Sequence, residues 1–112
     1  MDDIKKIHTN CQLQIFQSAK STVTQTCTVR LGATSFDIDY IAKGERVFWR
    51  CIEKAPGHYE CRTENTAIAR RGSLHQFHKG NFFEGYWTTE KGSNSSDGMW
   101  RITLGKPQKA TK

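Results

Sequence analysis

Long apolar segments are missing from this sequence. Its longest apolar runs contain three residues, as in Val47, Phe48 and Trp49, whereas a helix that spans a membrane needs about 20. From Met1 to Lys6 the chain also lacks an apolar stretch of signal-peptide length. We therefore expect a protein that has no membrane partner and stays inside the cell.

Catalytic motifs are missing as well. The chain contains no nucleophile elbow, no glycine-rich phosphate loop and no arrangement of Ser, His and Asp or of Cys and His that points to nucleophilic catalysis. Asp37 and Asp39 alternate along one predicted strand without a partner nucleophile, so we interpret them as solvated side chains. We expect a protein that is not an enzyme and takes no small-molecule substrate.

The composition nevertheless indicates a folded domain. Apolar residues make up 36% of the chain and charged residues 25%, which is neither a disordered nor a membrane composition. A domain of 112 residues buries only about two-thirds of its unfolded surface, so a covalent or metal staple would help it. The four cysteines are compatible with two disulfides, but that framework is typical of secreted domains.

The positive charge is concentrated in the middle of the chain. The formal net charge is +6, of which residues 41–80 contribute +4, from eight basic and four acidic side chains. Such a balance is typical of proteins with anionic partners, and it also keeps many small domains soluble. Charge by itself favours neither interpretation.

Period-two alternation of apolar and polar residues predicts β-strands along most of the chain. The stretches are residues 11–15, 27–31, 36–40 and 46–52, followed after residue 80 by two aromatic-rich segments that form a hairpin. Phe36, Tyr40 and Trp49 fall on one face, where we expect them to pack together. We predict strand also for residues 66–71, where a helix would be too short to be stable.

A set of Cys and His residues follows the fourth of these stretches. Cys51, Cys61, His75 and His78 are separated by nine, thirteen and two residues, and four such ligands can close a tetrahedral shell around zinc. Pro56 and Gly57 predict a turn that brings the two cysteines opposite each other. The sequence thus predicts a structural Zn2+ site, with His58 as a substitute if one closing histidine does not bind.

The run Phe48-Trp49-Arg50-Cys51, with Cys61-Arg62 and Leu74-His75-Gln76-Phe77-His78, resembles the FLYWCH-type zinc finger. That family shares a zinc-stapled antiparallel sheet with WRKY and GCM DNA-binding domains. The resemblance implies an all-β fold, a small antiparallel sheet of four to five strands stapled by one zinc. The C-terminal hairpin predicted from the alternation lies beyond the usual end of such a finger and is an extra element. The resemblance further implies a nuclear protein that regulates transcription or associates with chromatin.

The corresponding division of the chain has four parts. Residues 1–10 form a flexible N-terminus, 11–80 the finger, 81–105 the aromatic hairpin extension and 106–112 a basic tail. Within the finger, Cys11 and Cys27 are either a second metal or redox pair or two small buried apolar residues. We favour the buried residues, because neither cysteine has a well-spaced neighbouring ligand.

Two ligand classes follow from the resemblance. Related sheets insert an edge strand into the major groove of double-stranded DNA, and this implies a set of candidate contacts: Lys43, Arg46, Arg50, Lys54, Arg62, Arg70 and Arg71. Against DNA, Glu53, Glu60 and Glu64 interrupt the basic surface.

The competing class is a chromatin or transcription-factor protein as partner. Aromatic residues are enriched at binding hot spots, and five of them gather after the finger: Phe82, Phe83, Tyr86, Trp87 and Trp100. From sequence, protein interaction is the first expectation and DNA binding the alternative.

Overall fold

The computed structural model describes residues 6–17, 22–42, 44–64, 69–76, 80–89 and 97–106. These residues form eight strands in chain order: β1 (Lys6–Gln17), β2 (Val23–Leu31), β3 (Ser35–Ala42), β4 (Glu45–Ala55), β5 (His58–Glu64), β6 (Arg70–Gln76), β7 (Phe82–Thr89) and β8 (Asp97–Thr103). Every strand pairs antiparallel with the next one along the chain.

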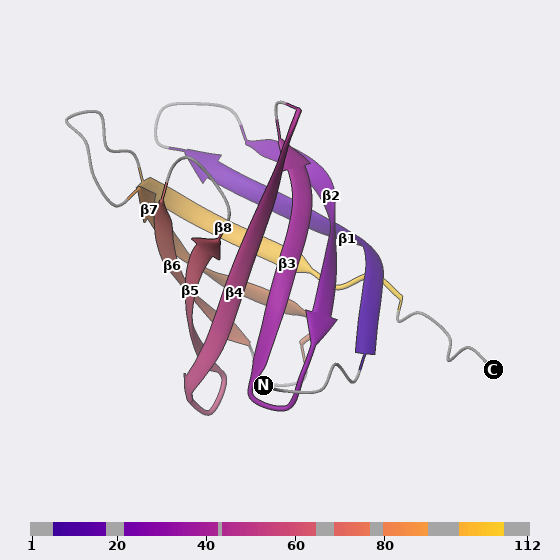
Figure 1. Cartoon of the computed structure of the whole chain (residues 1–112), viewed down its shortest axis with the longest axis vertical. Helices are drawn as coiled ribbons and strands as arrows, with labels where there is room; N and C mark the ends of the chain where they lie inside the picture. Colours follow the sequence, from indigo (N-terminus) through magenta and orange to yellow (C-terminus); the bar gives the residue numbers. More distant parts are fainter. Residues whose placement is uncertain are drawn as a thin grey trace.

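The sheet closes on itself because β1 also pairs with β8. Gln12 lies opposite Thr103 and Phe16 opposite Met99, so the first and last strands complete an up-and-down barrel. Figure 1 shows β1 and β8 crossing behind β3 and β4, with β5, β6 and β7 on the left. Closure leaves none of these eight strands with an unpaired edge.

Side chains fill the interior of the barrel. An eight-stranded barrel is just wide enough for this, and its strands alternate inward and outward residues. The inward set is almost entirely apolar: Cys11, Leu13, Cys27, Val29, Phe36, Ile38, Tyr40, Val47, Trp49, Cys51, Cys61, Leu74, Phe83, Trp87, Trp100 and Ile102. The function therefore has to be sought mainly on the outer wall.

Large and small residues complement each other in the core. Trp49 and Trp100 pack with ring centroids 4.5 Å apart, and the Trp49 indole N–H donates to the Tyr40 hydroxyl at 3.1 Å. Gly72 provides room on β6, because a Cβ there would lie 3.3 Å from the Trp100 ring and closer still to the Tyr86 carbonyl. This interlocking accounts for a filled core in so short a chain.

The predicted fold class was wrong in the number of strands and in the zinc staple. The chain is all-β and antiparallel, but it forms a closed barrel of eight strands instead of a sheet of four to five strands held by zinc. The aromatic C-terminal hairpin consists of β7 and β8, which are two strands of the barrel itself and not an extension. Residues 6–10, which we assigned from sequence to a flexible N-terminus, are the beginning of β1.

Local predictions fared better. The alternating stretches are β1 to β4, and Phe36, Tyr40 and Trp49 all lie in the core. Pro56 and Gly57 form the predicted turn, with Gly57 at φ 77° and Cys51 opposite Cys61. Asp37 and Asp39 are more than solvated, since both pair with Arg30.

Candidate functional site

The predicted zinc ligands do not converge among the described residues. Cys51 and Cys61 point into the barrel and are 0% and 1% exposed, whereas His75 lies exposed on the outer wall of β6. Burial, followed by contact with Cys61, raises the pKa of Cys51 well above its usual value, which disfavours the thiolate that zinc binds. His78 lies outside the described residues, within which no group of three metal-ligating side chains gathers. The described part of the predicted ligand set therefore does not fit a zinc ion.

The five aromatic candidates for partner binding divide between the two faces of the wall. Phe83, Trp87 and Trp100 are in the core and cannot contact a partner while the barrel is folded. Tyr86 is 48% exposed, and Phe82 is partly exposed beneath the Arg101 guanidinium. Only these two can contribute to a binding surface.

The basic candidates also differ from one another. Lys43 lies outside the described residues, and Arg46 is paired with Asp39 through two hydrogen bonds. Lys54 lies 3.9 Å from Glu60, an exposed pair of little energetic weight. Arg70 uses its backbone N–H to bind Thr63 and is half-buried. The remaining three basic candidates lie next to one another on the outer wall.

Arg50, Arg62 and Arg71 lie side by side on β4, β5 and β6. Arg50 is the register partner of Arg62, and Arg62 is the register partner of Arg71. Facing Cβ atoms in adjacent strands are about 5 Å apart, and like charges placed there destabilise a sheet. We call these three residues the arginine row.

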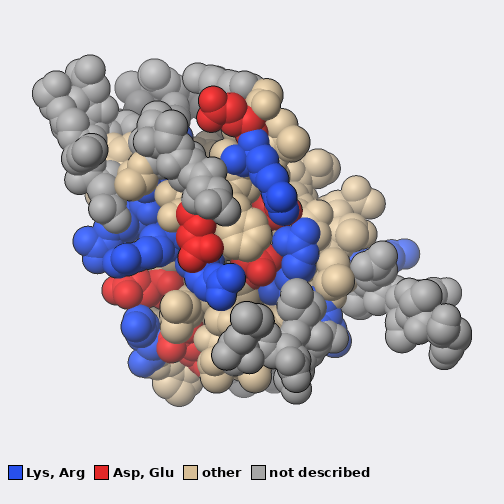
Figure 2. Space-filling view, in the orientation of Figure 1, with Lys and Arg blue, Asp and Glu red and all other residues tan. Residues whose placement is uncertain are grey.

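Charges of both signs surround the arginine row, since Asp37 on β3 is the register partner of Arg50. Among the described residues Arg50 and Arg62 make no ion pair, and Arg50 Nε is buried without a hydrogen-bond partner. Glu60 and Glu64 flank Arg62 along β5. Figure 2 shows Lys and Arg side chains gathered over this side of the barrel with acidic residues between them.

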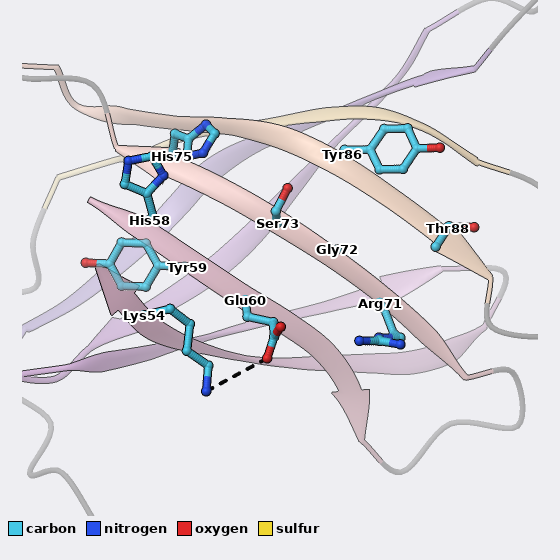
Figure 3. Close-up of a pocket in the computed structure, with 10 residues that line it drawn as sticks. All are labelled: Lys54, His58, Tyr59, Glu60, Arg71, Gly72, Ser73, His75, Tyr86 and Thr88. Atoms are coloured by element: carbon cyan, nitrogen blue, oxygen red, sulfur yellow. Dashed lines mark ion pairs between the residues drawn. The ribbon is translucent and has the colours of Figure 1, made fainter. Parts of the chain in front are cut away.

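A hollow of about 410 Å³ adjoins the arginine row on the outer wall. Arg71 belongs to both, and Figure 3 shows it at one end of the hollow with Thr88, while His58 and His75 lie at the other end. The two imidazoles are register partners whose ring centroids are 4.3 Å apart. Further lining comes from residues of β4 to β7: Lys54, Tyr59, Glu60, Gly72, Ser73 and Tyr86.

The chemistry of the hollow is that of a binding surface. It offers cations, hydroxyl groups and exposed rings, with Glu60 as its one carboxylate among the lining residues. Sequence reasoning named Arg71, Lys54 and Tyr86 but missed His58, His75 and Ser73 as members of one surface. Period-two parity on β6 would have placed Arg71, Ser73 and His75 on one face, but the register across strands was needed to add the rest.

Comparisons with protein-family models, curated proteins and solved structures find no match for this chain. The described residues contain no helical segment with the length and apolar character that crossing a bilayer requires. The FLYWCH resemblance stays a prediction from sequence, and the function has to be argued from the geometry of the outer wall.

Proposed function

We propose that this protein is a non-catalytic binding module that takes single-stranded nucleic acid on the outer wall of β4 to β7. The observation that carries the proposal is the arginine row. Two adjacent guanidinium groups repel each other by up to about 1 kcal/mol in water. A phosphate between them replaces that repulsion with charge-assisted hydrogen bonds.

The hollow supplies what a basic patch alone lacks. Single strands bind to grooves that combine cations for the backbone with rings on which bases stack. Arg71 lies at the end of the hollow next to the arginine row, and Tyr86 and the two histidines provide rings along it. Ser73 and Thr88 add hydroxyl groups that can hydrogen-bond base or sugar.

Barrel closure favours a single strand over the duplex expected from sequence. Insertion of an edge strand into the major groove needs a free edge, and each of the eight described strands is paired on both sides. The hollow on the outer wall can instead hold an unpaired chain whose bases stack on the exposed rings.

Fluorescence anisotropy with a labelled oligothymidine of about 12 nucleotides tests the proposal. With three phosphates neutralised, the logarithm of the association constant is expected to fall with the logarithm of salt concentration at a slope of about −2. Arg62→Ala and Arg71→Ala each weaken binding severalfold and flatten that slope.

Lys106→Ala is the matched control, because it removes one positive charge from an exposed residue after β8. The proposal is overturned if Lys106→Ala and Arg62→Ala weaken binding equally, or if the wild type retains no single strand at low salt. Stronger binding to a duplex of the same length would restore double-stranded DNA as the ligand.

Exposed apolar residues support a second candidate, a protein partner. Tyr86 and Met99 are register partners on β7 and β8, 48% and 50% exposed, and Phe16 lies opposite Met99 on β1. Capture of a defined partner from nuclease-treated nuclear extract favours this candidate if it is lost with Met99→Ser and retained with Arg62→Ala. Capture that survives Met99→Ser but is lost with Arg62→Ala would exclude this second candidate.

A further inference from the structure

The barrel contains two cysteine pairs built on the same plan. Cys11 lies opposite Cys27 on β1 and β2, and Cys51 lies opposite Cys61 on β4 and β5, and all four are free and buried. Cα atoms of directly facing residues are about 4.5–5.5 Å apart, within the range that a disulfide accepts. Backbone geometry therefore permits either bond, and the surroundings must decide between them.

A hollow in the outer wall adjoins the first pair. Cys27 lines this hollow and is 5% exposed, whereas Cys11 does not line it and is 0% exposed. The β2–β3 ladder runs from Leu31 opposite Phe36 to Thr28 opposite Asp39 and ends there, one residue short of Cys27. The hollow, of about 370 Å³, occupies the region beyond, and Tyr40 also lines it. Since a water molecule takes up about 30 Å³, small solutes fit there.

Cys61, by contrast, is covered on both sides. It pairs with Cys51 on β4 and with Gly72 on β6 in continuous stretches of ladder, and neither cysteine of this pair lines the hollows described above. The two pairs thus differ in access although their register is alike.

The Cys11 sulfur lies between a backbone donor and a backbone acceptor, since it accepts from the Gly105 N–H and its thiol donates to the His8 carbonyl at 3.3 Å. The register shifts between His8 and Cys11, and Asn10 there has φ 54°, so the chain bends and the Gly105 N–H points at Cys11 Sγ from 3.3 Å. The imidazole of His8 is held by its Nδ1–H, which donates to the Gly105 carbonyl at 2.7 Å. A bent strand, a backbone donor and a neighbouring imidazole therefore surround this sulfur.

The acidities of Cys11 and Cys27 depend first on the contact between their two sulfurs. A hydrogen bond from the Cys27 thiol lowers the pKa of Cys11 to about 6; burial opposes this, and the Gly105 amide and His8 add to it. The same hydrogen bond raises the pKa of Cys27, as do burial and the negative charges of Cys11 and Asp39. Cys11 is thus suited to act as the nucleophile, and Cys27 as the thiol that resolves the oxidised Cys11.

We propose that Cys11 and Cys27 form a redox-active dithiol that hydrogen peroxide, arriving at the hollow lined by Cys27, oxidises reversibly to a disulfide. The Cys11 thiolate attacks one peroxide oxygen, the O–O bond breaks, and the departing hydroxide takes a proton to become water. The Cys27 sulfur then displaces the hydroxyl group from the Cys11 sulfenic acid. The S–S bond forms, the S–O bond breaks, and a second water leaves with the proton of Cys27. Two thiols lose two electrons, and one peroxide becomes two waters.

Hydrogen peroxide added to the fully reduced protein tests this proposal. Intact-mass spectrometry is expected to show the loss of two hydrogen atoms, and peptide mapping to place the bond between Cys11 and Cys27. Cys51 and Cys61 remain alkylatable after unfolding and serve as the internal control. A thiol reductant restores the starting mass.

Variants and a pH profile complete the test. Cys27→Ser stops the reaction at a Cys11 sulfenic acid that dimedone traps, and Cys51→Ser leaves the rate unchanged. In the wild type, the oxidation rate is half-maximal near pH 6, the pKa of Cys11. If the serine variants do not fold, this wild-type profile and the peptide map decide the matter. A bond between Cys51 and Cys61 at an equal rate, or no intramolecular bond, overturns the proposal.

Discussion

Among single residues, Asp39 shows how the outer wall balances its charges. Its carboxylate accepts two hydrogen bonds from Arg46 and one from Arg30, and Arg30 also binds Asp37. Arg46 contributes most to lowering the pKa of Asp39, which burial opposes and Arg30 assists. This pairing distinguishes Arg46 from Arg50 and Arg62, which make no ion pair among the described residues.

Asp39 is expected to make the barrel sensitive to acid. Its folded pKa lies below the ordinary value of 3.8, so its contribution to stability is fully present above about pH 4 and is lost as the pH falls below that value. Asp39→Asn therefore flattens the fall of Tm between about pH 4 and pH 2 relative to the wild type.

Arg46→Ala is the companion variant, and carboxyl NMR titration is its measurement. We expect the pKa of Asp39 to rise toward its ordinary value, because the first of its stabilising partners is removed. An unchanged pKa of Asp39 in this variant would contradict the assignment.

At the level of the strand, Gly85 controls how closely β7 approaches β6. It is the register partner of Leu74 on β6 and of Trp100 on β8. A Cβ at this position would overlap the Ser73 carbonyl group, whose oxygen accepts the Trp100 indole N–H at 3.1 Å. Backbone, rather than a movable side chain, blocks the space.

Gly85→Ala is therefore expected to lower the free energy of unfolding by about 3 kcal/mol, because β6 and β7 must separate. The control is Gly44→Ala, where φ is 79° but no atom lies within 4 Å of the added Cβ. Its cost is backbone strain alone, about 1 kcal/mol. Urea unfolding compares the two, and equal losses would show that the close approach of β6 and β7 does not matter.

For the whole molecule, we expected from the sequence that a metal holds the fold together, and the structure instead shows a closed barrel. Eight ladders and sixteen buried apolar residues hold the described part of the chain together, and Cys51, Cys61 and His75 lie on two sides of the wall. Stability is therefore expected to depend on packing of the interior.

Exhaustive chelation with EDTA is expected to leave the Tm unchanged, as followed by circular dichroism. Added Zn2+ serves as the control and is expected to raise it no further. Cooperative loss of the β-sheet signal on chelation, restored by zinc, would show that a metal holds the fold after all.

The sequence by itself determined what depends on neighbours along the chain. Period-two alternation set which residues of β1 to β4 face inward, and Pro56 and Gly57 set the turn that brings Cys51 opposite Cys61. Both follow from local rules, since a strand alternates its faces and a tight turn requires a left-handed residue. The zinc prediction was based on ligands that do not come together among the described residues, because the same alternation places His75 outside the barrel.

Only the tertiary structure decided closure and everything that closure creates. No local signal shows that β1 meets β8, yet this pairing buries Trp100 and leaves no free edge among the eight strands. The arginine row likewise exists through registers between three strands. Such pairings are chosen by the burial of the whole interior, because eight strands bury in a closed barrel the apolar faces that a smaller sheet would leave exposed.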